Sequence, residues 1–165
     1  MSNPTPEARD AAEIRQSALQ LLVSGSAGDE PLRRAATVGH AFPVLASGSE
    51  LHSWFVPVTV GDRLVAFFQF LPDGTLMRFS SFQRKPGEYE RCPVAADWID
   101  LDRIQTRAAA QRREDESARA PFLTYDRTPD RLVWAVPLAN SRGETRLIYV
   151  AGEAVYAPPE GNTFG

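Results

Sequence analysis

The side chains that could do chemistry in this chain are few and scattered. His40 and His52 are the two histidines, and Cys92 is the single cysteine. Nucleophilic catalysis needs a thiol or hydroxyl with a base beside it, and nothing in the sequence places either imidazole next to Cys92. One cysteine alone forms no intramolecular disulfide. We therefore predict that none of these three residues is catalytic.

Three carboxylates follow one another closely in the segment DWIDLD, residues 97–102. A calcium loop needs oxygen ligands at alternate positions, Gly at the sixth and Glu at the twelfth. Trp98 and Leu101 occupy positions that such a loop keeps solvated. The pattern instead favours a helix start, with Asp97 or Asp100 as the N-cap and the other acids interacting with the helix dipole. We predict no metal site here.

Two segments rich in glycine and serine are better explained as turns than as binding loops. Gly25–Gly28 lacks the Lys-Ser/Thr pair that completes a phosphate-binding loop, and no buried strand precedes it. Ser47-Gly48-Ser49 does not fit the G-x-S-x-G pattern of a serine hydrolase. We predict that the protein is not an enzyme and that it has no catalytic, cofactor-binding or metal-binding residues.

Composition argues against several classes of partner. The net charge is −3, from 18 basic and 21 acidic residues, whereas nucleic acids and anionic membranes need a basic footprint. No apolar run reaches the roughly 18 residues of a membrane span, and the N-terminus does not resemble a secretory signal. We expect a cytoplasmic protein, with a secreted form that has lost its signal as the alternative. Lys85 is the one lysine, and this arginine bias indicates a GC-rich, bacterial genome.

Hydrophobic periodicity and turn residues predict one element order twice, a helix followed by an antiparallel β-meander. The first unit spans residues 6–82 and the second spans residues 96–157, with a polar linker at 83–95. Together they form a single domain over residues 1–165. The expected helices cover residues 6–23 (capped by Thr5), 31–38 and 96–118. The expected strands cover residues 42–46, 53–60, 63–71, 75–82, 122–126, 132–139, 144–151 and 154–157.

An internal repeat supports this division. The segment WFVPVTV aligns with WAVPLAN, so that Trp54 matches Trp134 and Pro57 matches Pro137, each 80 residues later. The same order of turns follows both segments, which favours duplication over coincidence. Because proline cannot donate a ladder hydrogen bond, we expect both prolines in edge strands or at bulges.

The segment WIDLDRIQTRAAAQ followed by LVWAVPLANSRGETRLIYVAGEAVY resembles the PepSY family of small domains. The resemblance covers about residues 96–157, and a looser version covers residues 6–82, so the two domains would stand in tandem. In the family an Asp-x-x-x-Gly turn precedes the closing strand, whereas this chain has only Gly152-Glu153. The resemblance implies a cystatin-like α+β fold that binds or inhibits other proteins, and it transfers no catalytic residue.

These observations predict an α+β fold in which both units form one continuous antiparallel sheet with the helices on one face. Packing of the two units face to face is the alternative. In a continuous sheet, Phe55, Leu147 and Tyr149 would lie on an open apolar face, which a homodimer would cover. We therefore expect a non-enzymatic protein-interaction or regulatory module with an unknown protein partner. The alternative is a small-molecule-binding protein that uses the concave face of the sheet.

Overall fold

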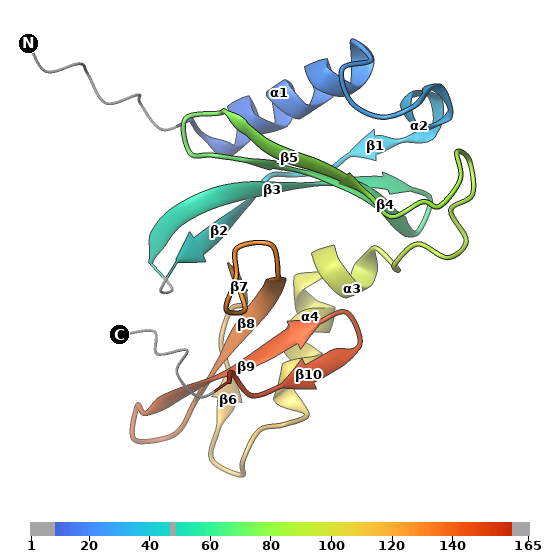
Figure 1. Cartoon of the computed structure of the whole chain (residues 1–165). Helices are drawn as coiled ribbons and strands as arrows, with labels where there is room; N and C mark the ends of the chain where they lie inside the picture. Colours follow the sequence, from blue (N-terminus) through green and yellow to red (C-terminus); the bar gives the residue numbers. More distant parts are fainter. Residues whose placement is uncertain (1–8, 47–48, 160–165) are drawn as a thin grey trace, which may run out of the picture. The chain divides into compact units, whose positions relative to one another are not determined.

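A computed structural model describes residues 9–46 and 49–159. Within these ranges the fold is α+β, with four helices and ten strands (Figure 1). The hydrogen-bonded strand order is β10-β9-β8-β7-β2-β3-β4-β5, with β1 on β3 and β6 on β8. The expected α+β class and large sheet are therefore confirmed, and the sheet is mostly antiparallel. The described exception is the parallel pair of β2 and β7, where Val44 is the partner of Leu123.

The chain divides into two compact units, Met1–Pro43 with His52–Cys92, and Val44–Leu51 with Pro93–Gly165. The first unit contains α1 (Ala11–Val23), α2 (Glu30–Ala35), β1 (Thr37–Val38), β4 (Arg63–Phe70), β5 (Leu76–Ser81) and most of β3 (Glu50–Val60). The second contains α3 (Ala96–Ile99), α4 (Leu101–Ala109), β6 (Ser117–Ala118), β7 (Phe122–Tyr125), β8 (Leu132–Ala139), β9 (Thr145–Ala151) and β10 (Ala154–Tyr156). The strand β2 (Phe42–Ala46) is shared, since its last three residues belong to the second unit.

The helix α1 begins later than the sequence predicted. Asp10, not Thr5, is its N-cap, because Asp10 and Glu13 form a capping box in which each side chain accepts a backbone N–H of the other residue. Thr5 lies outside the described residues. Ile14, Ala18 and Leu22 then recur every four residues and form the buried stripe of the helix.

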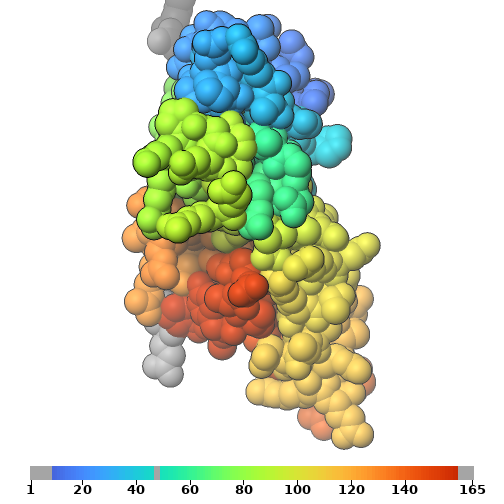
Figure 2. Space-filling model, turned by 90° about the vertical axis from the view of Figure 1, so that its right-hand side faces the viewer, coloured from blue at the N-terminus to red at the C-terminus, as the bar shows by residue number. Residues whose placement is uncertain are grey.

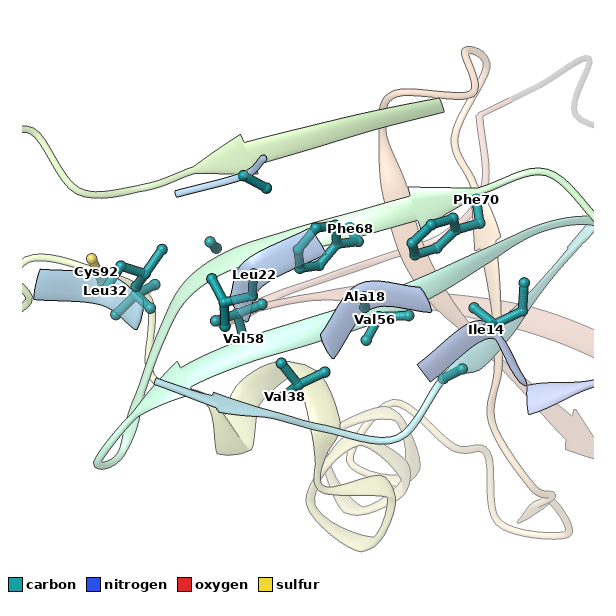
Figure 3. Close-up of a cluster of buried hydrophobic side chains, with 14 residues drawn as sticks. Ile14, Ala18, Leu22, Leu32, Val38, Val56, Val58, Phe68, Phe70 and Cys92 are labelled. Carbon is teal, nitrogen blue, oxygen red and sulfur yellow. The ribbon is translucent and has the colours of Figure 1, made fainter. Parts of the chain in front are cut away.

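The core of the first unit lies between this stripe and one face of β3 and β4. Alternate residues of both strands point toward the helix (Figure 3). Phe68 is fully buried in this core. The centre of its ring lies 5.9 Å from that of Phe70 and 4.8 Å from that of Phe79 in β5. The core side chains of the two strands that Figure 3 labels are Val56, Val58, Phe68 and Phe70.

Both prolines of the repeat lie in strands with neighbours on both sides, so the edge-strand alternative of the prediction was wrong. The bulge alternative is supported near Pro57, because the pairing of β3 with β4 shifts register between Val58 and Thr59, whereas β8 and β9 pair without a shift at Pro137. The Pro57 carbonyl accepts a hydrogen bond from Gly39 N at 2.9 Å, just beyond the end of β1. The Pro137 carbonyl accepts one from Arg119 N at 2.8 Å, just beyond β6. The N and C=O of a strand residue point to the same side. The nitrogen of Pro57 therefore faces the position just beyond β1, and that of Pro137 faces the position just beyond β6. No strand residue there needs an N–H donor from the proline.

The single helix expected over residues 96–118 is broken at Asp100 and ends at Ala109. Asp100 accepts from Arg103 N at 3.2 Å and so begins α4 as its N-cap. Residues 110–116 form turns instead of a polar helix tail, and β6 follows. The short helix expected at 31–38 likewise ends at Ala35, where Thr37 and Val38 form β1.

The open apolar face expected from the sequence is not present at the residues that suggested it. Phe55 is 4% exposed and Tyr149 is 0% exposed, while Leu147 is half-buried. In the second unit, Tyr149 lies in a small apolar cluster with Val133 and Ala135. No helix in the described part of the chain is long and apolar enough to cross a membrane.

Candidate functional site

The strand β5 forms one end of the strand order. It pairs antiparallel with β4, and among the described strands no second one lies beside it (Figure 1). Phe82 N donates to Val65 O of β4 at 2.9 Å. Because successive residues of a strand turn their backbone groups to alternate sides, Phe79 and Ser81 direct their N–H and C=O groups away from β4. The outer side of β5 therefore offers hydrogen-bonding groups to a further strand.

Exposed apolar side chains gather around this strand. Elsewhere in the described residues, the large apolar side chains that are exposed are Val23 on α1 and Leu101 on α4. Single exposed apolar residues are normal on a protein surface, but four of the six in the described residues lie on β5 or next to its ends. The group on β5 and its ends consists of Leu71, Leu76, Met77 and Phe82, each 38–41% exposed.

The side chain of Arg78 in β5 packs against two residues of β4, Gln69 and Phe67. Its Nε donates to Gln69 Oε1 at 2.9 Å, and its guanidinium lies 5.0 Å from the centre of the Phe67 ring. The Phe67 ring lies 5.2 Å from Phe55 and 5.8 Å from Phe82. A hydrogen bond and cation–π attraction therefore both hold the arginine of the edge strand against β4.

A chain of buried polar groups continues from Arg78 into the sheet. Gln69 Nε2 donates to Ser53 Oγ at 2.9 Å, and Ser53 Oγ lies 2.9 Å from His52 Nδ1. A serine hydroxyl beside an imidazole is the arrangement of an activated nucleophile. However, Ser53 and Gln69 are both 0% exposed, so no substrate reaches this hydroxyl. The polar chain instead fixes the register of β3, β4 and β5.

The two ends of β5 differ in charge. Asp73 precedes the strand, and its Oδ1 accepts from Thr75 N at 2.9 Å, which lowers the pKa of the Asp73 carboxyl. Arg9 Nε donates to the Asp73 carbonyl at 3.2 Å, and Arg9 Nη1 lies 3.9 Å from Glu13 Oε2, so the positive charge of Arg9 is shared with a second carboxylate. Arg84 and Lys85 follow the strand and are exposed on a surface segment, light green in Figure 2. The strand therefore runs from an acidic end to a basic end.

The three residues considered for catalysis have separate environments. His40 is exposed between β1 and β2, and His52 contacts Ser53. Cys92 is 3% exposed in the core near Leu32 (Figure 3), and burial raises the pKa of its thiol. A reactive thiol needs the opposite shift. Within the described ranges, no group of three or more His, Cys, Asp and Glu side chains could hold a metal ion.

Two of the three DWIDLD acids, Asp97 and Asp100, have structural contacts. Asp100, one of the two residues predicted as a helix N-cap, caps α4. Asp102 lies exposed in the first turn of the same helix. Asp97 is buried, with its Oδ1 3.0 Å from Arg103 and 2.9 Å from Arg107. The sequence contained a signal for this ion-pair group, since the two arginines lie four residues apart on one helix face.

The sequence did not predict that β5 is an edge strand, nor that hydrogen bonds link Arg78 through Gln69 to Ser53. The one available signal was Gln69, a polar residue in the otherwise apolar run LVAFFQFL. Comparison with protein-family models, with curated proteins and with solved structures finds no match for this chain. The function must therefore be inferred from the geometry of the chain itself.

Proposed function

We propose that this protein is a non-enzymatic interaction module that binds an extended protein segment along β5. In this mode, main-chain hydrogen bonds give affinity and pockets for alternate side chains give specificity. The observation that carries the proposal is the combination of one neighbouring strand with four half-exposed apolar side chains, Leu71, Leu76, Met77 and Phe82. A sheet edge is a template for pairing with a further strand. The register shift between β4 and β5 leaves Met77 out of the ladder, whereas Phe79 and Ser81 lie in the part of β5 that pairs regularly with β4, so this part favours a binding role.

We further propose that the two units are duplicated, PepSY-like domains with their helices on one face of the sheet. Corresponding pairings 80 residues apart support the duplication. In the first unit they join Thr37 to Thr59 and Val38 to Val58; in the second they join Ser117 to Ala139 and Ala118 to Leu138. The PepSY resemblance itself implies protein binding, which agrees with the role proposed for β5.

The two units differ where the binding role requires it. The closing strand of the second unit, β10, has three residues and is followed by Pro158-Pro159. Proline blunts a sheet edge because it has no N–H to donate. The closing strand of the first unit, β5, has six residues and contains no proline. We therefore assign binding to the first unit.

Small-molecule binding on the sheet is the weaker proposal. On the face of β3 and β4 opposite α1, Ser53 and Gln69 are fully buried and Phe55 is nearly so. The described surface depression lies elsewhere, on α1, where one helix and its cap line it. A ligand pocket usually draws its lining from several elements and encloses its ligand, so this depression does not favour the role.

Selection of extended peptides against the whole chain tests the proposal. Amide NMR shifts should change along β5 when a selected peptide binds. Ser81→Pro removes an outward N–H, and Met77→Lys charges the edge, so both should weaken binding at least about tenfold. Val23→Lys is the matched control, because it charges an apolar residue that is 78% exposed on α1. Equal binding by all four proteins, or no selected peptide at all, would overturn the proposal.

A further inference from the structure

We propose that β5 pairs with β5 of a second copy of this chain, antiparallel about a two-fold axis at Phe79. This inference rests on the proposed function of the β5 edge and names its occupant. Two-fold pairing joins the same surface of both copies and closes the assembly at a dimer. The chain then needs no other protein to cover its unpaired backbone.

The backbone and the side chains favour this register. Phe79 directs its N–H and C=O outward and lies in the part of β5 that pairs regularly with β4, on the C-terminal side of the register shift at Met77. Arg78 then lies opposite Ser80 of the second copy, next to Met77, where β5 shifts its register against β4. A register centred on Ser81 would instead place Arg78 opposite Arg84, and like charges directly opposite each other are destabilising.

The charges at the ends of the strand are self-complementary. Asp73 lies before β5, and Lys85 lies after it. Antiparallel pairing of identical strands brings the start of one strand to the end of the other. Each Asp73 is thus brought toward Lys85 of the second copy, twice in the dimer. The half-exposed Leu76 and Phe82, at opposite ends of β5, are likewise brought together and shielded from water.

Sedimentation velocity of the full chain over a range of concentrations tests the dimer. The wild-type chain and Val23→Lys should form a reversible dimer, whereas Ser81→Pro and Met77→Lys should remain monomeric at the same concentrations. Circular dichroism of each variant checks that the fold is intact. A wild-type monomer at every concentration, or a dimer that persists in folded Ser81→Pro, would overturn the inference.

A charge exchange tests the register. Asp73→Lys and Lys85→Asp should each weaken dimerisation by up to about fivefold, as expected for exposed ion pairs, and the double variant should restore it. Failure of the double variant to recover would contradict pairing about Phe79. If the wild-type chain is monomeric but selected peptides still bind β5, the inference fails and the proposed function stands. If neither copy nor peptide protects the β5 amides from hydrogen exchange, both fail.

Discussion

Gly39 lies directly against the ring of Pro57. Its N–H donates to the Pro57 carbonyl at 2.9 Å, and a Cβ on Gly39 would lie 2.9 Å from Pro57 Cγ. The φ of Gly39 is not positive, so its backbone suits any residue and only the proline ring excludes a side chain. In the second unit Arg119 makes the same hydrogen bond to Pro137 and carries a long side chain.

Gly39→Ala should lower the free energy of unfolding by about 1–3 kcal/mol, the usual cost of forcing an extra carbon into a packed site. Urea denaturation measures the change. Arg119→Ala, at the corresponding ladder position, is the control and should change it by less than about 0.5 kcal/mol. Equal effects of the two substitutions would mean that the contact with the Pro57 ring is not restrictive.

The sequence predicted the strands well because their signals are local. Gly61, Gly74, Gly143 and Gly152 all have positive φ in the turns, as expected where glycine relieves steric strain. The strand expected at residues 132–139 has the expected bounds. The repeat also placed Trp54 and Trp134 at corresponding ladder positions, facing Phe70 and Val150.

What the sequence did not predict depends on contacts between distant residues. Trp134 is 2% exposed, and its Nε1 donates to Trp98 O at 2.8 Å. The Nε1 of half-buried Trp54 has no hydrogen-bond partner among the described residues. The environments of the two tryptophans therefore differ despite the matching sequence. The β5 edge was missed for a similar reason, because local periodicity does not reveal which strand ends a sheet.

Asp100→Ala should lower the free energy of unfolding by about 1 kcal/mol, because it removes the side chain that caps α4. Asp102→Ala, in the first turn of the same helix, removes an acid that makes no cap bond. It should have a smaller effect, limited to the loss of an exposed charge near the helix dipole. Thermal unfolding by circular dichroism compares the two. A larger loss from Asp102→Ala would contradict the assignment of the cap.

Glu116→Gln should destabilise the protein at neutral pH. Arg146 binds the Glu116 carboxylate with Nε and Nη2, at 2.8 to 3.2 Å, and Arg113 N donates to it at 2.7 Å. These bonds lower the pKa of Glu116 to about 2, from an ordinary value of 4.5. The stabilisation is therefore fully present above about pH 4.5 and is lost as the pH falls through about 2.

Urea midpoints of the wild-type chain and Glu116→Gln, measured from neutral to acidic pH, check this dependence. The difference between them should be largest at neutral pH and should shrink as the wild-type carboxylate becomes protonated. Glu114→Gln, on the exposed part of the same loop, should match the wild type throughout. A difference that stays constant with pH would mean that the charge of Glu116 does not stabilise the loop.

Tyr156→Phe should lower the free energy of unfolding by about 1–3 kcal/mol at neutral pH, since it leaves a buried acceptor with one donor fewer. The Tyr156 hydroxyl donates to Asp126 Oδ2 at 2.8 Å, and Asp126 is 2% exposed. Tyr89→Phe is the matched control, because the buried Tyr89 hydroxyl has no hydrogen-bond partner in the described residues. Its loss should be neutral or stabilising. Urea denaturation of both variants measures the difference.

The same tyrosine should also titrate late. Burial and the bond to Asp126 raise the pKa of Tyr156 to about 12, from an ordinary value of 10.0. The stability contributed by the neutral phenol is therefore fully present below about pH 10 and is lost as the pH rises through about 12. Phenolate absorbance should show one late-titrating tyrosine fewer in Tyr156→Phe than in the wild type. Its unfolding free energy should also fall less steeply in this alkaline range. Identical alkaline titrations of the two proteins would show that the Asp126 contact does not hold the phenol neutral.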